Sequence, residues 1–100
     1  MARVKFQKVV LSVAFYREGN KFIAYSPAFD LSTCGDSQEQ AKRRFEEALK
    51  IFLEEIDKMG TFEDVLLECG WRKIGHTQKR WEPPQYVGQA PKEIRIPCPA

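Results

Sequence analysis

A long amphipathic segment between Ser37 and Gly60 constrains the fold of this chain more than any other feature. Apolar residues recur every three or four positions along it, and charged residues fill most of the positions between them. Ser37 and Gln40 have the spacing of a capping box at its start, and Gly60 accepts the left-handed conformation that often follows a helix. The pattern predicts one helix of about 22 residues, against a mean of roughly 12. We expect so long a helix to lie across a whole sheet.

The residues before this helix predict a small antiparallel sheet. Residues 4–16 alternate an apolar face with a mixed face, which predicts a first strand. Gly19 suits a tight hairpin turn into a second strand over residues 22–25. Pro27 has no amide hydrogen to donate and ends that strand, and a short third strand follows over residues 31–34. Together these signals predict a three-stranded meander.

The residues after the long helix predict a second, shorter helix and one or two further strands. A capping pattern at Thr61 starts the short helix, and Gly70 ends it. Residues 71–74 are suited to a strand, residues 75–91 are irregular, and the apolar residues over 93–98 alternate as in a strand. The fold class is therefore α+β: a small antiparallel sheet of three to four strands, with one long helix packed across it and a short second helix.

The chain has 100 residues, which is enough for one domain with a modest core. We expect residues 1–74 to form the α+β domain. Residues 75–100 are expected to be an irregular basic tail that ends in a short strand and belongs to the same domain or to a dimer contact. Residues 1–70 hold ten Lys or Arg against twelve Asp or Glu, whereas residues 71–100 hold six against two. An anionic partner would therefore meet mainly the tail.

The composition is that of an ordinary globular protein, with 43% hydrophobic and 30% charged residues. No apolar run approaches the roughly 20 residues that span a bilayer, and the N-terminus lacks the apolar segment of a signal peptide. We therefore expect a cytoplasmic protein. Cys34, Cys69 and Cys98 match neither a CxxC metal pair nor a disulfide framework, so we expect reduced thiols, the first two of them in the core.

The order of motifs from the second strand into the long helix resembles the N-terminal domain of HicB-type antitoxins. That family has an aromatic strand ending in Pro, then an acidic residue and Leu, a Gly-Asp-Thr or Gly-Asp-Ser cap, and a Glu-Glu-Ala helix with a later Glu-Ala-Leu. The corresponding residues here are Tyr25-Ser26-Pro27, Asp30-Leu31, Gly35-Asp36-Ser37, Glu39-Gln40-Ala41 and Glu46-Glu47-Ala48-Leu49. The resemblance covers roughly residues 8–58, about half of the chain, and rests on the ordered set of motifs.

This resemblance implies a partial ribonuclease-H-like fold and a noncatalytic antitoxin that binds and occludes a small HicA-type toxin. Such toxins are RNA-cleaving proteins with a double-stranded-RNA-binding-like fold. Many HicB-type proteins add a C-terminal helix-turn-helix or ribbon-helix-helix module for operator DNA. Residues 75–100 of this chain depart from that pattern, because they are rich in Pro and Gly and lack a helical apolar period. This departure argues against operator binding by this chain. We expect a homodimer or higher homo-oligomer through a sheet edge or the C-terminal strand.

The candidate catalytic residues of this sequence have ordinary structural explanations. Ribonuclease-H-like enzymes bind metal ions through clustered carboxylates, one of them on the first strand, yet residues 4–16 contain no Asp or Glu. Asp30 is explained as a turn residue and Asp36 as part of the helix cap. His76, the one histidine, lies in a Gly-containing stretch and is explained as a loop residue. We expect no enzymatic activity, no metal and no cofactor.

Acidic residues near the helix start are the candidates for binding a toxin. An RNA-cleaving partner must have a basic active surface, and complementary charge on the inhibitor favours the complex. An exposed sheet edge beside these acids would add backbone pairing. Acidic residues on a helix are also commonly a solvated face without a partner. The candidate toxin-binding residues are Asp30, Asp36, Glu39, Glu46 and Glu47.

The basic tail is a second candidate surface, because it combines cations with aromatic rings as nucleic-acid-binding proteins do. Its candidate residues are Arg72, Lys73, Lys79, Arg80 and Trp81. The structural alternative is that Trp71 completes the core, that Trp81 packs at a subunit contact, and that the charges face solvent. Two functions thus stand beside the antitoxin prediction: a stand-alone interaction or ligand-sensing domain on the same fold, and a weak nucleic-acid binder that uses the tail.

Overall fold

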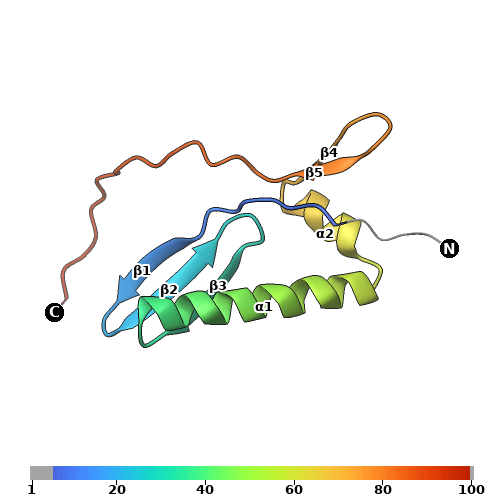
Figure 1. Ribbon diagram of the computed structural model, residues 1–100. Coiled ribbons are helices and arrows are strands. Elements are labelled where there is room, and N and C mark those ends of the chain that lie inside the picture. The colour runs from blue at the N-terminus through green and yellow to red at the C-terminus, as the bar shows by residue number, and fades with distance from the viewer. Residues whose placement is uncertain (1–5, 100) are drawn as a thin grey trace.

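Three short strands followed by one long helix form most of the structure, a computed structural model that describes residues 6–99 (Figure 1). The predicted α+β class is confirmed. The sheet is antiparallel with the strand order β1-β2-β3, and a separate two-stranded sheet contains β4 and β5. The elements are β1 (Ala14–Glu18), β2 (Lys21–Ser26), β3 (Leu31–Gly35), α1 (Gln38–Lys58), α2 (Phe62–Glu68), β4 (Arg72–Ile74) and β5 (Arg80–Glu82).

The first strand is shorter than the sequence predicts. It begins at Ala14, which lies opposite Tyr25 of β2, and the predicted start at residue 4 lies outside the described residues. The strand β2 ends one residue later, at Ser26, because Pro27 has no amide hydrogen to offer a neighbouring strand. Residues 6–13 therefore extend beyond the end of β2 and find no strand to pair with in this part of the chain. We call residues 6–13 the N-terminal overhang.

Helix α1 begins and ends where the capping signals predict. The hydroxyl of Ser37 accepts a hydrogen bond from the backbone amide of Gln40 at 3.0 Å. The side chain of Gln40 returns to the backbone amide of Asp36 at 2.6 Å, one residue before the position that a standard capping box uses. Gly60 follows the helix with a φ of 72°, a conformation that glycine adopts without steric cost. The helix has 21 residues, close to the predicted length.

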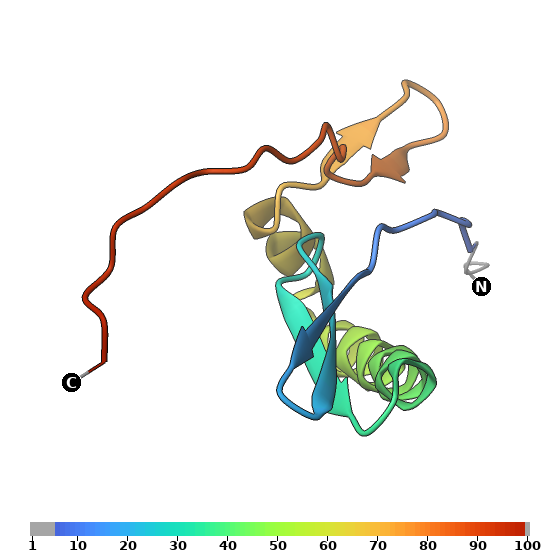
Figure 2. The ribbon, with the colours of Figure 1, turned by 90° about the vertical axis from the view of Figure 1, so that its left-hand side faces the viewer.

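The helix packs on one face of the sheet, mainly over β2 and β3 (Figure 2). Ala24 of β2 and Ala41 of α1 are fully buried, so small side chains meet where the helix approaches the strands, and Phe45 fills the space beside them. A second buried cluster joins the far end of α1 to α2 and the β2–β3 turn. Its residues are Ala28, Phe29, Ile56, Leu66 and Trp71. The expectation that Trp71 completes the core is confirmed.

The second helix lacks the predicted side-chain cap. Within the described chain, the Thr61 side chain makes no capping bond to the helix and instead donates to the carbonyl oxygen of Ile56, at 3.4 Å. The helix is held by its buried apolar face, with Leu66 only 2% exposed. Gly70 ends it with a φ of 91°, as predicted.

The sequence predicts only the first strand of the hairpin that follows α2. Strand β4 lies within the predicted range 71–74, but it pairs with β5, which forms inside the range 75–91 that we expected to be irregular. Gly75 enters the turn with a φ of 101°, which favours glycine there. The hairpin is a separate sheet, and not a fourth strand of the main one.

Residues 83–99 form what we call the C-terminal arm, which extends away from the rest of the molecule (Figures 1 and 2). The strand predicted over 93–98 is absent, because this stretch has no neighbouring strand to pair with in the described chain. Cys34 is exposed, so its prediction as a core thiol is wrong, while Cys69 is partly buried; both are free thiols, as is Cys98. Among residues 6–99, no helix is both long enough and apolar enough to cross a bilayer.

Candidate functional site

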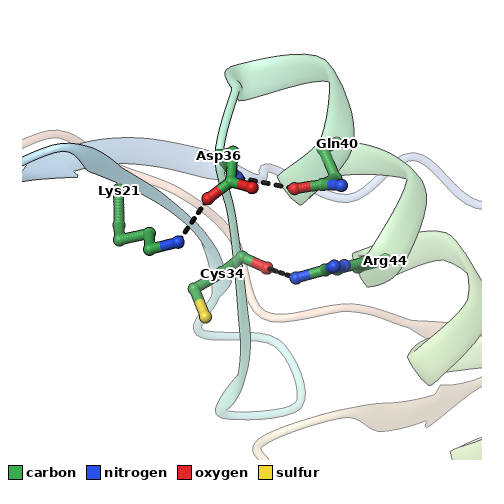
Figure 3. A network of polar contacts seen from close by, with 5 residues as sticks. All are labelled: Lys21, Cys34, Asp36, Gln40 and Arg44. Carbon is green, nitrogen blue, oxygen red and sulfur yellow. Dashed lines mark hydrogen bonds and ion pairs between the residues drawn. The ribbon is translucent and has the colours of Figure 1, made fainter.

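The start of α1 is tied to the sheet by a small polar network (Figure 3). Lys21, at the start of β2, forms an ion pair with Asp36, which lies directly after β3. In the second turn of the helix, the guanidinium of Arg44 donates to the carbonyl oxygen of Cys34 at 2.9 Å. The hydrogen bond from Lys21 lowers the pKa of the Asp36 carboxyl from its ordinary value. Asp36 is therefore an anion already engaged by its own chain.

The predicted acidic set does not gather into one patch. Asp30 and Asp36 lie at opposite ends of β3, about 20 Å apart along an extended strand. Asp30 adopts a φ of 50° in the turn before β3, as expected for a turn residue, and accepts a hydrogen bond from the hydroxyl of Tyr25 at 3.0 Å. That bond raises the pKa of Tyr25. The structure thus separates Asp30 from the acids of the helix start.

The three glutamates of the set lie on the exposed side of α1. Glu39, Glu46 and Glu47 are all exposed, and none forms an ion pair within residues 6–99. Lys42 lies between Glu39 and Glu46 at helical spacing, and Arg43 lies one turn before Glu47. This face therefore alternates in sign, and its negative charge is spread along the helix rather than concentrated.

The predicted basic set, by contrast, is brought together by the β4–β5 hairpin. Arg72, Lys73, Arg80 and Trp81 belong to its strands and Lys79 to its turn. Two of the four cations already have anionic partners within the chain. Their partners are Glu82 for Arg72 and Glu63 for Lys73.

The aromatic ring of the hairpin is also engaged. The ammonium group of Lys73 lies 5.7 Å from the centre of the Trp81 ring, and the ring of Phe62 packs edge-on at 6.4 Å. In the same hairpin, the side-chain hydrogen bond to Glu82 raises the pKa of the Arg72 guanidinium above its ordinary value. Lys79 and Arg80 are left without an ion-pair partner in the described region, so the basic surface reduces to two cations.

A contact without a local sequence signal joins the N-terminal overhang to the hairpin. The side-chain amide of Gln7 donates to the carbonyl oxygen of Trp81 at 2.6 Å and accepts from its backbone amide at 2.8 Å. This pair of bonds imitates the pairing of a neighbouring strand. A single glutamine between Phe6 and Lys8 carries no local signal for such a distant partner, which is why sequence reasoning missed it.

The overhang and the C-terminal arm border an open cleft of about 710 Å³. Residues 10–12 line one side, and the first part of the arm, residues 83–88, lines the other, with Ala28 and Arg72 also in the lining. Apolar groups make up most of the lining. These two segments are far apart in the sequence and carry no local signal that they lie close together, so the cleft was not predicted.

The remaining reactive side chains do not form a cluster. His76 lies exposed in the β4–β5 turn, and burial raises the pKa of the Cys69 thiol, which makes it less reactive. Within residues 6–99, no three His, Cys, Asp or Glu side chains are grouped so that they could hold a metal ion.

Comparison with family models, curated proteins and solved structures gives no match to this chain. The fold by itself defines a class, a small α+β domain with a meander under one long helix and an attached hairpin. Membership of the HicB-type family stays a prediction that rests on the ordered motifs.

Proposed function

We propose that this chain is a noncatalytic HicB-type antitoxin that binds and occludes a small HicA-type RNA-cleaving toxin. The proposal rests on the ordered motifs between Tyr25 and Leu49, which resemble that family. One observation supports it most directly: these motifs fold into one continuous unit, β2, β3 and the capped start of α1. The Gly-Asp-Ser element is the junction of strand and helix, the place that the resemblance assigns to it.

The charge of the helix offers a surface for such a partner. A protein that cleaves RNA must present cations to phosphates, and Glu39, Glu46 and Glu47 are exposed acids that form no ion pair within residues 6–99. Asp30 and Asp36 contribute less, because Tyr25 and Lys21 already bind them. We therefore propose the three glutamates as the main toxin-facing acids.

Co-expression tests the proposal. The partner to try is the product of a neighbouring gene of roughly 60 to 80 residues, basic, with a Gly-rich segment and a His on a predicted strand. We expect the two proteins to elute as one complex, the growth defect caused by the partner to be relieved, and its RNA cleavage to stop. Two proteins that elute separately would contradict the proposal.

A charge-matched pair of variants locates the surface. The triple change Glu39→Gln, Glu46→Gln and Glu47→Gln should slow association with the toxin by about tenfold at low salt and weaken its salt dependence. The control Glu54→Gln, Glu55→Gln and Glu68→Gln removes the same net charge from other positions and should leave association nearly unchanged. Equal effects of both triples would show that only net charge matters.

Nucleic-acid binding through the hairpin is the weaker alternative, because Arg72 and Lys73 are paired with glutamates. A gel shift with duplex DNA and with RNA at low salt distinguishes it. Binding that disappears in the double variant Lys79→Ala, Arg80→Ala would favour the alternative. A chain that binds neither nucleic acid nor the neighbouring gene product would instead fit a stand-alone interaction or ligand-sensing domain.

A further inference from the structure

The C-terminal arm borders the cleft with its first residues, 83–88, and exposes large apolar side chains along the rest of its length. Its residues make no hydrogen bond with residues 6–82, and large side chains are exposed along it: 93% for Val87, 68% for Ile94 and 73% for Ile96. The arm stretches the molecule to 64 Å, and the radius of gyration is 17.2 Å, against roughly 13 Å for a compact chain of this length. An extended segment with this composition is suited to pairing with another chain.

The prolines of the arm restrict it to pairing on one side. In an extended strand, successive residues direct their backbone amides to opposite edges. Pro83 and Pro84 open the arm beside the hairpin, and the prolines of its last part, Pro91, Pro97 and Pro99, all stand at odd positions. Over residues 91–99 the edge that odd residues would serve therefore lacks several donors. Ile94 and Ile96 stand at even positions and keep theirs. The edge that the even residues face can therefore form the backbone hydrogen bonds of a β-sheet. The edge that the odd residues face resists the addition of a further strand.

The free edge of β1 offers a matching set of backbone groups. Gly19 and Asn20 form a two-residue turn, so Glu18 and Lys21 are the hydrogen-bonded pair that closes the hairpin. The even residues of β1 therefore bond to β2, and odd residues direct their amides and carbonyls outward. The N-terminal overhang continues this edge, and residues 10–12 border the open cleft. Among the described residues, no strand covers it.

We propose that the C-terminal arm of one copy pairs antiparallel with the outer edge of β1 and the N-terminal overhang of a second copy. Even residues of the arm then face odd residues of the edge. Ile94 lies opposite Val13, and Ile96 opposite Leu11. In this register none of the arm's charged residues faces a residue of like charge. The isoleucines extend the side of the sheet on which Val13 and Phe15 pack against the core.

The direction of the arm indicates a second copy and not its own sheet. Figure 1 shows that the arm and β1 run the same way along the molecule, so antiparallel pairing needs an edge from another chain. A two-fold axis makes the exchange reciprocal, and both arms are buried by one arrangement. This exchange goes beyond the proposed toxin binding and does not depend on it.

Light scattering after size exclusion gives the first test. We expect the full chain to elute as a dimer of twice its 11.6 kDa. The variant Ile94→Asp, Ile96→Asp should weaken the dimer at least 100-fold, because it places two charges in the new core. The control Glu93→Ser, Arg95→Ser changes the side chains of the other face and should remain dimeric. A monomeric wild-type chain, or a dimer that the aspartates leave intact, would overturn the proposal.

Paramagnetic broadening in mixed samples identifies the contact. One copy carries Cys34→Ser and Cys69→Ala, with a nitroxide on Cys98; the other is ¹⁵N-labelled and carries Cys98→Ser. We expect residues 9–13 of the ¹⁵N-labelled copy to lose amide intensity. A second sample reverses the label, with ¹⁵N on the nitroxide-bearing copy and an excess of unlabelled Cys98→Ser chain. Loss of intensity at residues 9–13 in this second sample only would mean that the arm folds onto its own sheet, which also overturns the proposal.

Discussion

The indole nitrogen of Trp71 donates a hydrogen bond to the carbonyl oxygen of Ala28 at 2.9 Å, across 43 positions of sequence. Ala28 lies in the turn between β2 and β3, and Trp71 lies directly after α2. Both residues are buried, and the ring of Phe29 packs 5.1 Å from that of Trp71. This contact holds α2, and the hairpin that follows it, against the end of the main sheet.

Replacing Trp71 by Phe should destabilise the protein by about 3 kcal/mol, because the smaller ring leaves a cavity and the carbonyl of Ala28 loses its partner. Urea unfolding followed by circular dichroism measures this. Trp81→Phe is the matched control, since Trp81 is only partly buried and its indole nitrogen makes no hydrogen bond within the described structure. We expect the control to cost under about 1 kcal/mol. Equal losses would refute the importance of the Trp71 contact.

The elements that the sequence predicts well are those whose signals are local. The spacing of apolar residues in α1, the hydroxyl of Ser37 and the glycine at position 60 act within a few residues of one another, so the helix could be located closely. The candidate acids share residue type and neighbourhood in sequence, but neither property reveals that Lys21 binds Asp36.

The features that the sequence missed depend on distant partners. Strand β5 exists because β4 lies beside it, and its outer edge meets Gln7 across 74 positions. The strand predicted over 93–98 fails for the opposite reason, since an alternating pattern forms a strand only where a neighbour supplies hydrogen bonds. Thr61 likewise resembles a cap, but tertiary packing directs its hydroxyl back to Ile56.

The two predicted helix caps can be compared directly. Ser37→Ala removes a hydroxyl that accepts from the Gln40 amide, and it should destabilise the protein by about 1 kcal/mol. Thr61→Ala removes a hydroxyl with only a 3.4 Å contact and should cost less than half as much. Thermal unfolding of both variants beside the wild type measures the difference. A larger loss at Thr61 would contradict the assignment of the caps.

The ion pair of Asp36 and Lys21 predicts a pH dependence with a definite sign. Lys21 lowers the pKa of Asp36 in the folded state, so the ionised form of Asp36 is more stable in the folded protein than in the unfolded chain. This stabilisation is present above the ordinary aspartate pKa of about 3.9 and is lost as pH falls through the lowered folded-state value. The Tm of wild type should therefore exceed that of Asp36→Asn near neutral pH, by a few degrees at most because the pair is exposed.

A double-mutant cycle isolates this ion pair from other effects at Asp36. In a Lys21→Ala background, Asp36→Asn should no longer lower the Tm at neutral pH by the same amount, and its acid dependence should flatten. Scanning calorimetry at several pH values in low salt measures the four proteins. A Tm difference that grows as pH falls would have the wrong sign for this interaction.

Gly35 gives a test of whether the Gly-Asp-Ser element is scaffold or binding surface. Gly35 is buried, and a Cβ there would lie 2.7 Å from the backbone nitrogen of Ala41 and 3.0 Å from the side chain of Gln40. Gly35→Ala should therefore displace the start of α1 and cost about 2 kcal/mol, with loss of exchange protection at the Asp36 amide that Gln40 holds. Gly19→Ala is the control, because it strains only the local backbone, with a φ of 60° and no atom within 4 Å of the added carbon. If the element acts as scaffold, both variants should bind the toxin in proportion to the fraction folded. Weaker binding by a fully folded Gly35→Ala variant would show instead that the helix start contacts the partner.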